Sequence, residues 1–492
     1  MSANDPIYLD YAASTPVDPT VIEAIARSLA VEGGRGNPAS LHRWGRRAAE
    51  HIERARAQVA ALIGAASAEI VFTSGATESD NLAVLGAARG AGHRGRHVVS
   101  SRIEHKAGLD PCRRLEKEGF AVTLVAPDRS GRIDPRALAT ALRPDTVLAS
   151  IMWVNNETGV IQDVAAIGAL CRERGILFHT DAAQAAGRIA IDMHALPIDL
   201  ASFTAHKLYG PKGIGALYVR SDIRAQVQPL LFGGGQERGL RPGTLPTHQI
   251  VGFGVACALA QAALGSEAAR LRGLGERLWE HLRPLGGVHL NGADAPRVPG
   301  VLNVSFEGVE GESLFTGLTE LAVSTGSACN SASGEPSYVL RALGRDSELA
   351  QSSLRFSFGR FTTETEIDAA GRAVLREVTR LRALSPASEL AETGGELVGE
   401  AGGPGQEVWI RFRLQVRDGR VTRVAHRVYG CPHTLAAAAW LAERLPGRTR
   451  TELVPGTPAE WAEALAVPVE KLGRLLTLED ALHQCQQRWP GV

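Results

Sequence analysis

The sequence predicts an α/β protein with a mostly parallel sheet, followed by a small α+β domain. From about residue 70, short apolar runs such as E-I-V-F-T, H-V-V-S-S and I-L-F-H-T-D alternate with longer helical patterns. Continuous apolar strands of this kind are buried on both faces, which favours a parallel sheet covered by helices. A stretch rich in Gly, Ala and Glu begins at Ser385, and we interpret residues 386–406 as a linker before the second domain.

Polar side chains follow several of the predicted strands. The run T-V-L-A-S-I-M-W-V leads into Asn155 and Asn156, I-L-F-H-T-D ends at Asp181, and D-L-A-S-F-T-A-H-K ends at Lys207. The carboxyl ends of parallel strands meet at the edge where α/β sheets bind their ligands. These residues therefore form a candidate site.

The region after the linker has the pattern of a hairpin followed by helices. V-W-I-R-F-R-L-Q-V from Val408 alternates apolar and polar residues, Asp418-Gly419 is typical of a tight turn, and R-V-T-R-V-A-H-R-V-Y returns as a second strand. Helical patterns continue to the end of the chain, notably from Leu472 to Gln487. We expect a separate small domain here.

The composition is that of an ordinary globular protein with no strong overall charge. The 492 residues are 44% hydrophobic, and Lys plus Arg equals Asp plus Glu at 53 each, which excludes a general attraction to nucleic acid or anionic membranes. The start of the chain has no secretory signal, and the most apolar helical run, Ile250 to Leu264, is interrupted by Gln261 and too short to span a bilayer. We expect a soluble cytoplasmic protein whose function depends on a local site.

The cysteines indicate neither a disulfide framework nor a metal site. The six are widely spaced and form no C-x-x-C pair. Cys329 stands among small residues in S-T-G-S-A-C-N-S-A-S, whereas a buried structural cysteine usually has bulky apolar neighbours. This setting predicts a loop, and both a functional thiol and an inert surface thiol fit it.

Three features together point to pyridoxal phosphate. The block V-F-T-S-G-A-T-E-S-D from Val71 is a strand, a turn and a helix start, which suits a phosphate, although a plain helix cap explains it as well. Lys207 precedes a Gly- and Pro-rich turn, and alone it could simply be solvated. Asp181 follows an apolar strand, where a carboxylate is costly unless a cation pairs with it. A lysine, a carboxylate and a phosphate site are what this cofactor requires.

Ordered blocks along the chain resemble the cysteine desulfurases of bacterial iron-sulfur cluster assembly, which are pyridoxal-phosphate enzymes of the aspartate aminotransferase fold. The blocks include Y-L-D-Y-A-A-S-T-P, F-T-S-G-A-T-E-S-D-N-L-A, E-H-K-A, M-W-V-N-N-E-T-G, H-T-D-A-A-Q, H-K-L-Y-G-P-K-G, R-P-G-T-L-P, S-T-G-S-A-C-N-S and S-L-R-F-S-F-G-R-F. The resemblance covers residues 1 to about 385. It implies a large domain over about 15–260 and a small domain built from the N-terminal segment and about 261–385.

The resemblance implies roles for residues around the cofactor. Lys207 would bind pyridoxal phosphate covalently, Asp181 would keep its ring nitrogen protonated, and His105 would stack on the ring and exchange protons with the substrate. The other implied cofactor contacts are Gln184, Asn156, Thr77, Thr204 and His206.

Further residues would act on the substrate and at a dimer contact. In this family a threonine from the second subunit of a homodimer completes the phosphate site, and the matching residue is Thr244. Arg355 would bind the substrate carboxylate, with Asn156 on the same side, because a guanidinium fork suits a carboxylate. Cys329 would accept sulfur from L-cysteine as a persulfide, release alanine and deliver the sulfur to a scaffold protein or another acceptor.

The segment from Glu407 to the C-terminus, over residues 407–492, resembles the small scaffold protein on which iron-sulfur clusters are assembled. Cys431, which opens a helix after Tyr429-Gly430, matches one cluster-binding cysteine. The positions expected for the remaining ligands carry other residue types, namely Gly405, Glu407, Gly473 and Arg474. A cluster held mainly by thiolates would lose most of its ligands here, so we expect no metal site. The domain would act by docking or as a sulfur relay through Cys431.

Three functional hypotheses follow from these patterns. The favoured one is an active cysteine desulfurase with a degenerate scaffold-like domain. The second is a selenocysteine lyase of the same fold, against which the setting of Cys329 argues. The third is an assembly platform that docks partners without turnover, against which the intact Lys207, Asp181, His105 and Arg355 argue.

Overall fold

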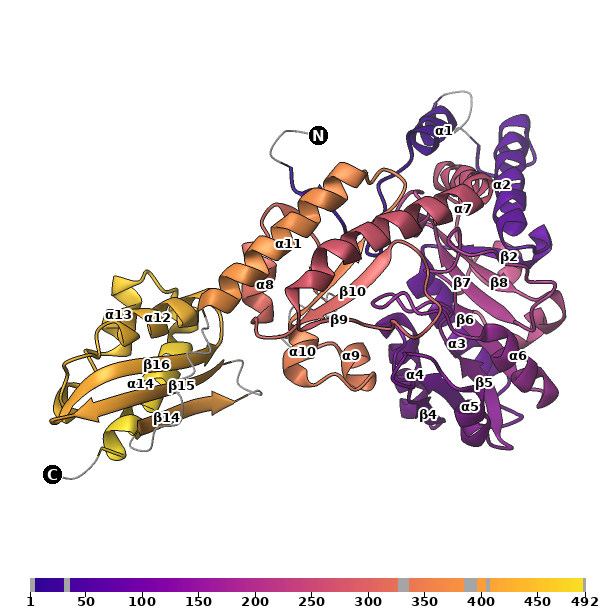
Figure 1. Cartoon of the computed structure of the whole chain (residues 1–492). Coiled ribbons are helices and arrows are strands. Elements are labelled where there is room, and N and C mark those ends of the chain that lie inside the picture. The colour runs from indigo at the N-terminus through magenta and orange to yellow at the C-terminus, as the bar shows by residue number, and fades with distance from the viewer. Residues whose placement is uncertain (1–4, 31–35, 326–335, 385–395, 404–407, 490–492) are drawn as a thin grey trace.

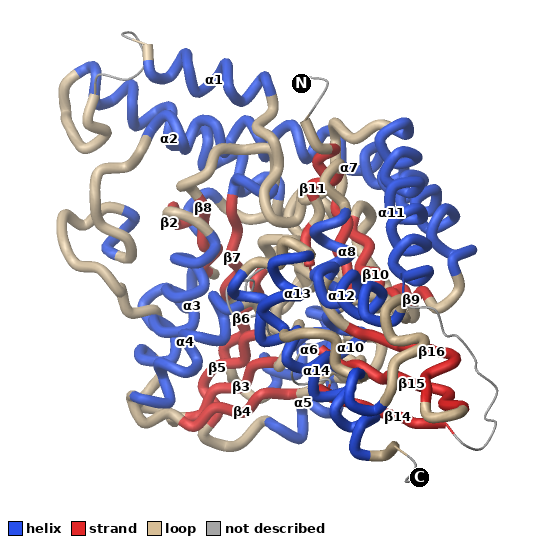
Figure 2. The backbone as a smooth tube through the Cα atoms, turned by 90° about the vertical axis from the view of Figure 1, so that its left-hand side faces the viewer, coloured by secondary structure: helices blue, strands red, loops and turns tan. Residues whose placement is uncertain are grey.

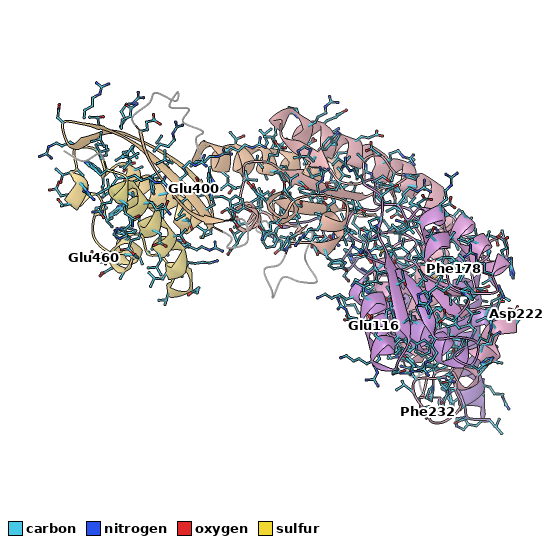
Figure 3. The ribbon with its side chains drawn as sticks, turned by 90° about the horizontal axis from the view of Figure 1, so that it is seen from below. Glu116, Phe178, Asp222, Phe232, Glu400 and Glu460 are labelled. Carbon is cyan, nitrogen blue, oxygen red and sulfur yellow. The ribbon has the colours of Figure 1, made fainter. Side chains whose placement is uncertain are left out.

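The computed structural model describes residues 5–30, 36–325, 336–384, 396–403 and 408–489. Three parts follow one another along its length: a large domain, a small domain and a C-terminal domain (Figure 1). Figure 3 shows the same order from below, with Phe178 and Asp222 in the large domain at one end and Glu400 and Glu460 in the C-terminal domain at the other.

The large domain is built on a seven-stranded sheet with the order β2-β8-β7-β6-β5-β3-β4. Strands β7, β6, β5, β3 and β4 are parallel to one another, and β8 is antiparallel to both β7 and β2. The strands are β2 (Ile70–Thr73), β3 (His97–Ser101), β4 (Ala121–Val125), β5 (Thr146–Ser150), β6 (Leu177–Asp181), β7 (Leu200–Thr204) and β8 (Gly215–Val219). The predicted mostly parallel sheet is confirmed.

Both faces of this sheet are buried, as the apolar runs predict. Phe72, Phe178 and Phe203 belong to the core on one face, while their chain neighbours Val71 and Leu177 belong to the core on the other. The helices of the large domain lie around the sheet (Figure 2). They are α1 (Pro19–Leu29), α2 (Arg43–Leu62), α3 (Ala76–Gly90), α4 (Lys106–Lys117), α5 (Pro135–Ala141), α6 (Val164–Glu173) and the first part of α7 (Thr247–Leu282).

The length of helix α7 contradicts the expectation that its apolar run is too short to span a bilayer. With the short turn that follows, it extends over Thr247–Leu285, and by length and composition alone it could cross a membrane. Gln261 does not interrupt it, because glutamine is compatible with a helix interior, and its side-chain amide donates to the Ala61 carbonyl of α2 at 3.2 Å. Phe253 is buried in the core of the large domain and Leu278 in that of the small domain, so α7 packs as a core helix shared by both.

The small domain contains a four-stranded antiparallel sheet, β12-β13-β10-β9, and a short parallel pair between β1 and β11. Its N-terminal strand comes from the start of the chain, as expected. Its elements are β1 (Ile7–Tyr8), β9 (Val288–Leu290), β10 (Val301–Phe306), α8 (Gly311–Gly317), β11 (Leu321–Ala322), β12 (Ser324–Thr325), α9 (Tyr338–Ala342), α10 (Ser347–Gln351), β13 (Ser353–Ser357) and α11 (Glu364–Leu384).

The C-terminal domain is a three-stranded antiparallel sheet with helices on one face. The predicted hairpin is confirmed, since Asp418 and Gly419 both adopt positive φ between its strands. The predicted last helix is confirmed with the same bounds. The elements are β14 (Glu396–Gly403), β15 (Val408–Arg417), β16 (Arg420–Tyr429), α12 (Pro432–Ala442), α13 (Pro458–Ala464) and α14 (Leu472–Gln487).

The interpretation of residues 386–406 as a linker is wrong for Glu396–Gly403, which form β14. This strand pairs with β15 along its whole length, and Leu397 is buried in the core. The glycine that suggested a flexible linker has a packing role, because a Cβ on Gly399 would collide with the Ala481 carbonyl and the Cys485 sulfur of α14. The domain therefore begins before residue 407.

Candidate active site

The parallel strands bring the predicted residues to one edge of the large sheet. Asp181 ends β6, and Lys207 lies in a single helical turn directly after β7. His105 follows β3 as the N-cap of α4, and Asn156 follows β5. The expectation that the polar strand ends share one edge is confirmed.

The Lys207 side chain contacts the N-terminal segment of the chain. Its Nζ donates to the Ala12 carbonyl at 2.5 Å, and the side-chain amide of Gln184 donates to the same carbonyl at 2.9 Å. Gln184 is buried, yet its Oε1 has no hydrogen-bond partner among the described residues. A buried acceptor without a donor is costly, so this oxygen is available for a hydroxyl of a bound group.

Two buried acidic residues, Asp80 and Glu104, lie near Asp181. Asp181 accepts from the Ala183 amide at 2.9 Å. Asp80 of α3 is 1% exposed and lies 3.5 Å from Nε2 of His179, and both its oxygens lack a hydrogen-bond partner among the described residues. Burial and then the Asp181 charge raise the pKa of Asp80 well above its usual value. A carboxylate at Asp181 can pair with a protonated nitrogen of a bound group.

Glu104 is a second fully buried carboxyl in this region. It accepts from the Met152 amide at 2.9 Å, and burial raises its pKa to about 8. Glu104 and Asp80 were not identified from the sequence as functional residues, although both lie in or beside the quoted blocks. Only the fold shows that helix α3 and the turn between β3 and α4 bring these two residues close to Asp181.

His105 is poised as a neutral imidazole. Its Nδ1 accepts from the Ala107 amide at 3.1 Å, which caps helix α4 and leaves the proton of the neutral ring on Nε2. Burial lowers the pKa of His105, and the nearby Lys207 charge lowers it too, while Asp181 opposes them. A neutral ring can stack and exchange a proton.

Two of the predicted phosphate residues, Thr77 and Thr204, lie at or beside the start of α3. A Cβ on Gly75, the N-cap of this helix, would lie 3.7 Å from the Thr204 hydroxyl, so Thr204 of β7 contacts the first turn that carries Thr77. His206 lies with Nδ1 3.3 Å from the Ser14 hydroxyl. Burial, with the charges of Lys207 and Lys212, lowers its pKa to about 4.

The approach of α3 to the sheet depends on glycine. A Cβ on Gly215 of β8 would lie 2.6 Å from the Cα of Gly75, closer than real Cβ contacts allow. The absence of a side chain lets the backbone amides of the helix start face the strand ends. Such a helix N-terminus suits a phosphate.

Arg355 is fixed at the small-domain side of the site. It lies on β13 and is 4% exposed, with one guanidinium nitrogen 2.7 Å from Asp10 Oδ1 and another 2.9 Å from the Asn156 carbonyl. Asp10, from the Y-L-D-Y block, was not identified as functional from the sequence. It orients the guanidinium and joins the N-terminal segment to the site.

Cys329 lies outside the described residues, but both ends of its segment are anchored at the site. Before the segment, Ser324 of β12 pairs directly opposite Arg355. After it, the Tyr338 hydroxyl donates to the Glu104 carbonyl at 2.6 Å, next to His105 in the chain.

The remaining predicted residues lie elsewhere. Thr244 is exposed on the loop before α7. It lines a surface hollow together with Asn37 and Glu237, and Lys207 does not line this hollow. Cys431 is buried in the C-terminal domain. Of the positions expected for further cluster ligands there, Gly405 and Glu407 lie outside the described residues, and Gly473 and Arg474 lie in the first turn of α14.

Comparison with known proteins agrees with this geometry. The family model for class-V aminotransferases matches residues 7–370. Cysteine desulfurase IscS of Cronobacter sakazakii is 57% identical over 393 residues, which cover 80% of this chain and 97% of that protein. The corresponding protein of Klebsiella pneumoniae is 56% identical with the same coverage. This chain belongs to the cysteine desulfurase family.

Solved structures of the family agree in fold. A NifS-like protein superposes with a TM-score of 0.71 at 36% identity, covering 76% of this chain and 100% of its own. SspA in complex with cysteine superposes with a TM-score of 0.65 at 40% identity, covering 72% and 99%. The family model ends at residue 370, so the C-terminal domain lies beyond it.

The cofactor of this family is pyridoxal phosphate, and the residues of this chain fit it. Lys207 offers an amine, the Asp181 carboxylate can pair with a protonated ring nitrogen, and Gln184 offers an acceptor with no partner among the described residues. The helix start at Gly75 and the Thr204 hydroxyl suit its phosphate.

Proposed function

We propose that this protein converts L-cysteine to L-alanine and a persulfide on Cys329, and so supplies sulfur for iron-sulfur cluster assembly and other thiolation pathways. The observation that carries the proposal is the anchoring of the Cys329 segment. Its two described ends meet the substrate-side arginine and the backbone beside His105, so the segment starts and ends at the site.

Pyridoxal phosphate, when bound, supplies an aldehyde for amino groups and a ring that withdraws electrons from the substrate α-carbon. The chain supplies the rest. Arg355, held by Asp10, offers a guanidinium fork for the substrate carboxylate. The Lys207 amine can take the proton from the α-carbon, and the neutral His105 can pass protons between substrate atoms.

The sulfur leaves by nucleophilic attack. The Cys329 thiolate attacks the substrate sulfur, so that a sulfur–sulfur bond forms as the carbon–sulfur bond breaks. The electron pair of the broken bond stays with the carbon, which takes up a proton and becomes the methyl group of alanine. No external oxidant or reductant is needed for this step.

We further propose that the enzyme acts as a cytoplasmic homodimer. Thr244 would complete the phosphate site of the second subunit, which agrees with its exposed position away from Lys207. A cytoplasmic location fits a thiol-based transfer, since that compartment keeps cysteines reduced. The C-terminal domain would be a scaffold-like module without its cluster ligands, and a separate scaffold protein would receive the sulfur.

The direct test is alanine formation from L-cysteine by the purified protein with a reducing thiol present. We expect alanine and sulfide in equal amounts from the wild type. In Cys329→Ser we expect L-cysteine to bind, seen as a change in the visible absorbance, with no persulfide formed. Equal turnover in Cys329→Ser would contradict the proposal. Turnover of L-selenocysteine with none of L-cysteine would instead favour a selenocysteine lyase.

A further inference from the structure

The C-terminal domain contacts the small domain at the point where β16 leads into α12. The Ser313 hydroxyl of α8 lies 3.3 Å from the Gly430 carbonyl, and the Tyr429 hydroxyl lies 3.3 Å from the Gln351 side-chain oxygen. Helix α12 contacts α11, and Figure 1 shows it next to the lower end of that helix. The contact therefore has a defined position and uses the face of α8.

Two cations of the C-terminal domain meet one carboxylate at this contact. Glu312 of α8 pairs with Lys471 at 2.6 Å and with Arg474 at 3.2 Å. Burial alone would raise the pKa of Glu312, but these two charges outweigh it and lower the pKa. The carboxylate is 41% exposed, so salt can screen the pairs.

Cys431 directly follows the residue whose carbonyl meets Ser313 of the small domain. It is the N-cap residue of α12 and only 1% exposed, with Sγ 3.3 Å from the Thr434 hydroxyl. Burial alone would lower the pKa of Arg474, yet its neighbours Cys431 and Glu312 raise it. Arg474 thus interacts with the Cys431 thiol of its own domain and with the Glu312 carboxylate of the small domain.

Buried apolar residues of the small domain and the C-terminal domain form one continuous core. A cleft of about 720 Å³ lies beside the contact, between Trp409 and Arg427 of the C-terminal domain and Glu310 and Glu348 of the small domain. The cleft is open to solvent, and salt can screen the Glu312 ion pairs at this contact.

We infer that the α8 face around Glu312 is the docking surface for the chain's own C-terminal domain, and that docking withholds the Cys431 thiol from solvent. In the docked state Cys431 cannot accept sulfur from Cys329, and a separate protein that needs the α8 face must first displace the domain. The inference does not depend on the proposed desulfurase activity, because its test measures thiol reactivity.

The test is alkylation of the native full-length protein by iodoacetamide, followed peptide by peptide with mass spectrometry. In Glu312→Lys, which turns the attraction into repulsion, we expect Cys431 to react on the order of tenfold faster than in the wild type. High salt should raise the wild-type rate in the same direction. Cys485, buried on α14 in the core of the same domain, reports unfolding and should stay unreactive.

Two variants separate docking from nonspecific effects. Glu312→Lys combined with Lys471→Glu restores one pair of opposite charges without changing Arg474, which contacts the thiol, and should return Cys431 toward the slow wild-type rate. Glu276→Lys makes the same charge change on an exposed residue of α7 and should have no effect. The inference is overturned if Cys431 stays unreactive in Glu312→Lys, if Cys485 reacts as fast as Cys431, or if the charge exchange restores nothing.

Discussion

At the scale of single residues, two carboxyl groups near the site are buried and have shifted pKa values. Asp80 and Glu104 lie near Asp181, and both have pKa values raised mainly by burial. At neutral pH the Glu104 carboxyl therefore stays mostly protonated. The neighbouring Asp181 charge adds to the upward shift of both pKa values, because like charges repel in a buried setting.

Glu104 should make the folded state sensitive to pH. Its pKa is raised from 4.5 to about 8, so between these values the unfolded chain loses the proton while the folded chain keeps it. The contribution of this group to stability is therefore greatest below pH 4.5 and declines as pH rises to about 8. In Glu104→Gln, the thermal midpoint should fall less between pH 5 and about 8 than in the wild type.

The control for this measurement is Glu116→Gln, an exposed position on α4 in the same domain (Figure 3). It should keep the wild-type pH dependence. If Glu104→Gln and the wild type lose stability in parallel, Glu104 is not the group responsible.

His105 caps α4, and the proposed mechanism gives its imidazole a chemical role as well, so substitution can separate the two. His105→Asn keeps a side chain able to cap α4 and removes the imidazole, whereas His105→Ala removes both. We expect alanine formation to fall about 100-fold or more in both variants, the usual scale for general acid-base catalysis. Only His105→Ala should also lose thermal stability. A wild-type rate in His105→Asn would limit the residue to capping.

Lys207 should carry the cofactor covalently. Borohydride reduction of the purified protein should leave a pyridoxyl group on Lys207, found by peptide mass spectrometry. Lys207→Ala should carry no such group on any lysine while retaining its fold by circular dichroism. A pyridoxyl group on another lysine of the wild type would show that the assignment is wrong.

At the level of elements, the site depends on how the segment that carries Cys329 is anchored. Tyr338, at the start of α9, fixes one end through the Glu104 carbonyl. Tyr338→Phe removes this hydrogen bond and keeps the ring. We expect persulfide formation to slow by several-fold, about the effect of one lost hydrogen bond, while binding of L-cysteine, followed by absorbance, stays unchanged. Weakened binding with normal transfer would contradict this role.

The sequence predicts most elements that form the site, for identifiable reasons. Strands such as Leu177–Asp181 are continuous apolar runs that end in a polar residue, and the Asp418-Gly419 turn has little choice of conformation. The strand at Glu396–Gly403 could not be predicted, because its glycines indicate a linker until the position of α14 is known. Asp10 was missed for a similar reason: its partner Arg355 is far away in the chain.

At the scale of the whole molecule, the proposed dimer predicts complementation between two inactive chains. A heterodimer of Lys207→Ala and Thr244→Ala subunits contains one site with both Lys207 and the partner's intact Thr244. If Thr244 acts across the dimer, mixing should recover about half of the wild-type activity, because one of two sites is whole. Differently tagged subunits purified together give the measurement. No recovery in the heterodimer would show that Thr244 serves its own subunit or no site.

The central claim, that Cys329 takes the sulfur of L-cysteine, is tested most directly with substrate carrying a heavy sulfur isotope. After one turnover without a reducing thiol, peptide mass spectrometry locates the isotope while alanine is counted in the same sample. The account predicts heavy sulfur on Cys329 in an amount equal to the alanine formed, and none on Cys431. Alanine formed without heavy sulfur on Cys329 would contradict it.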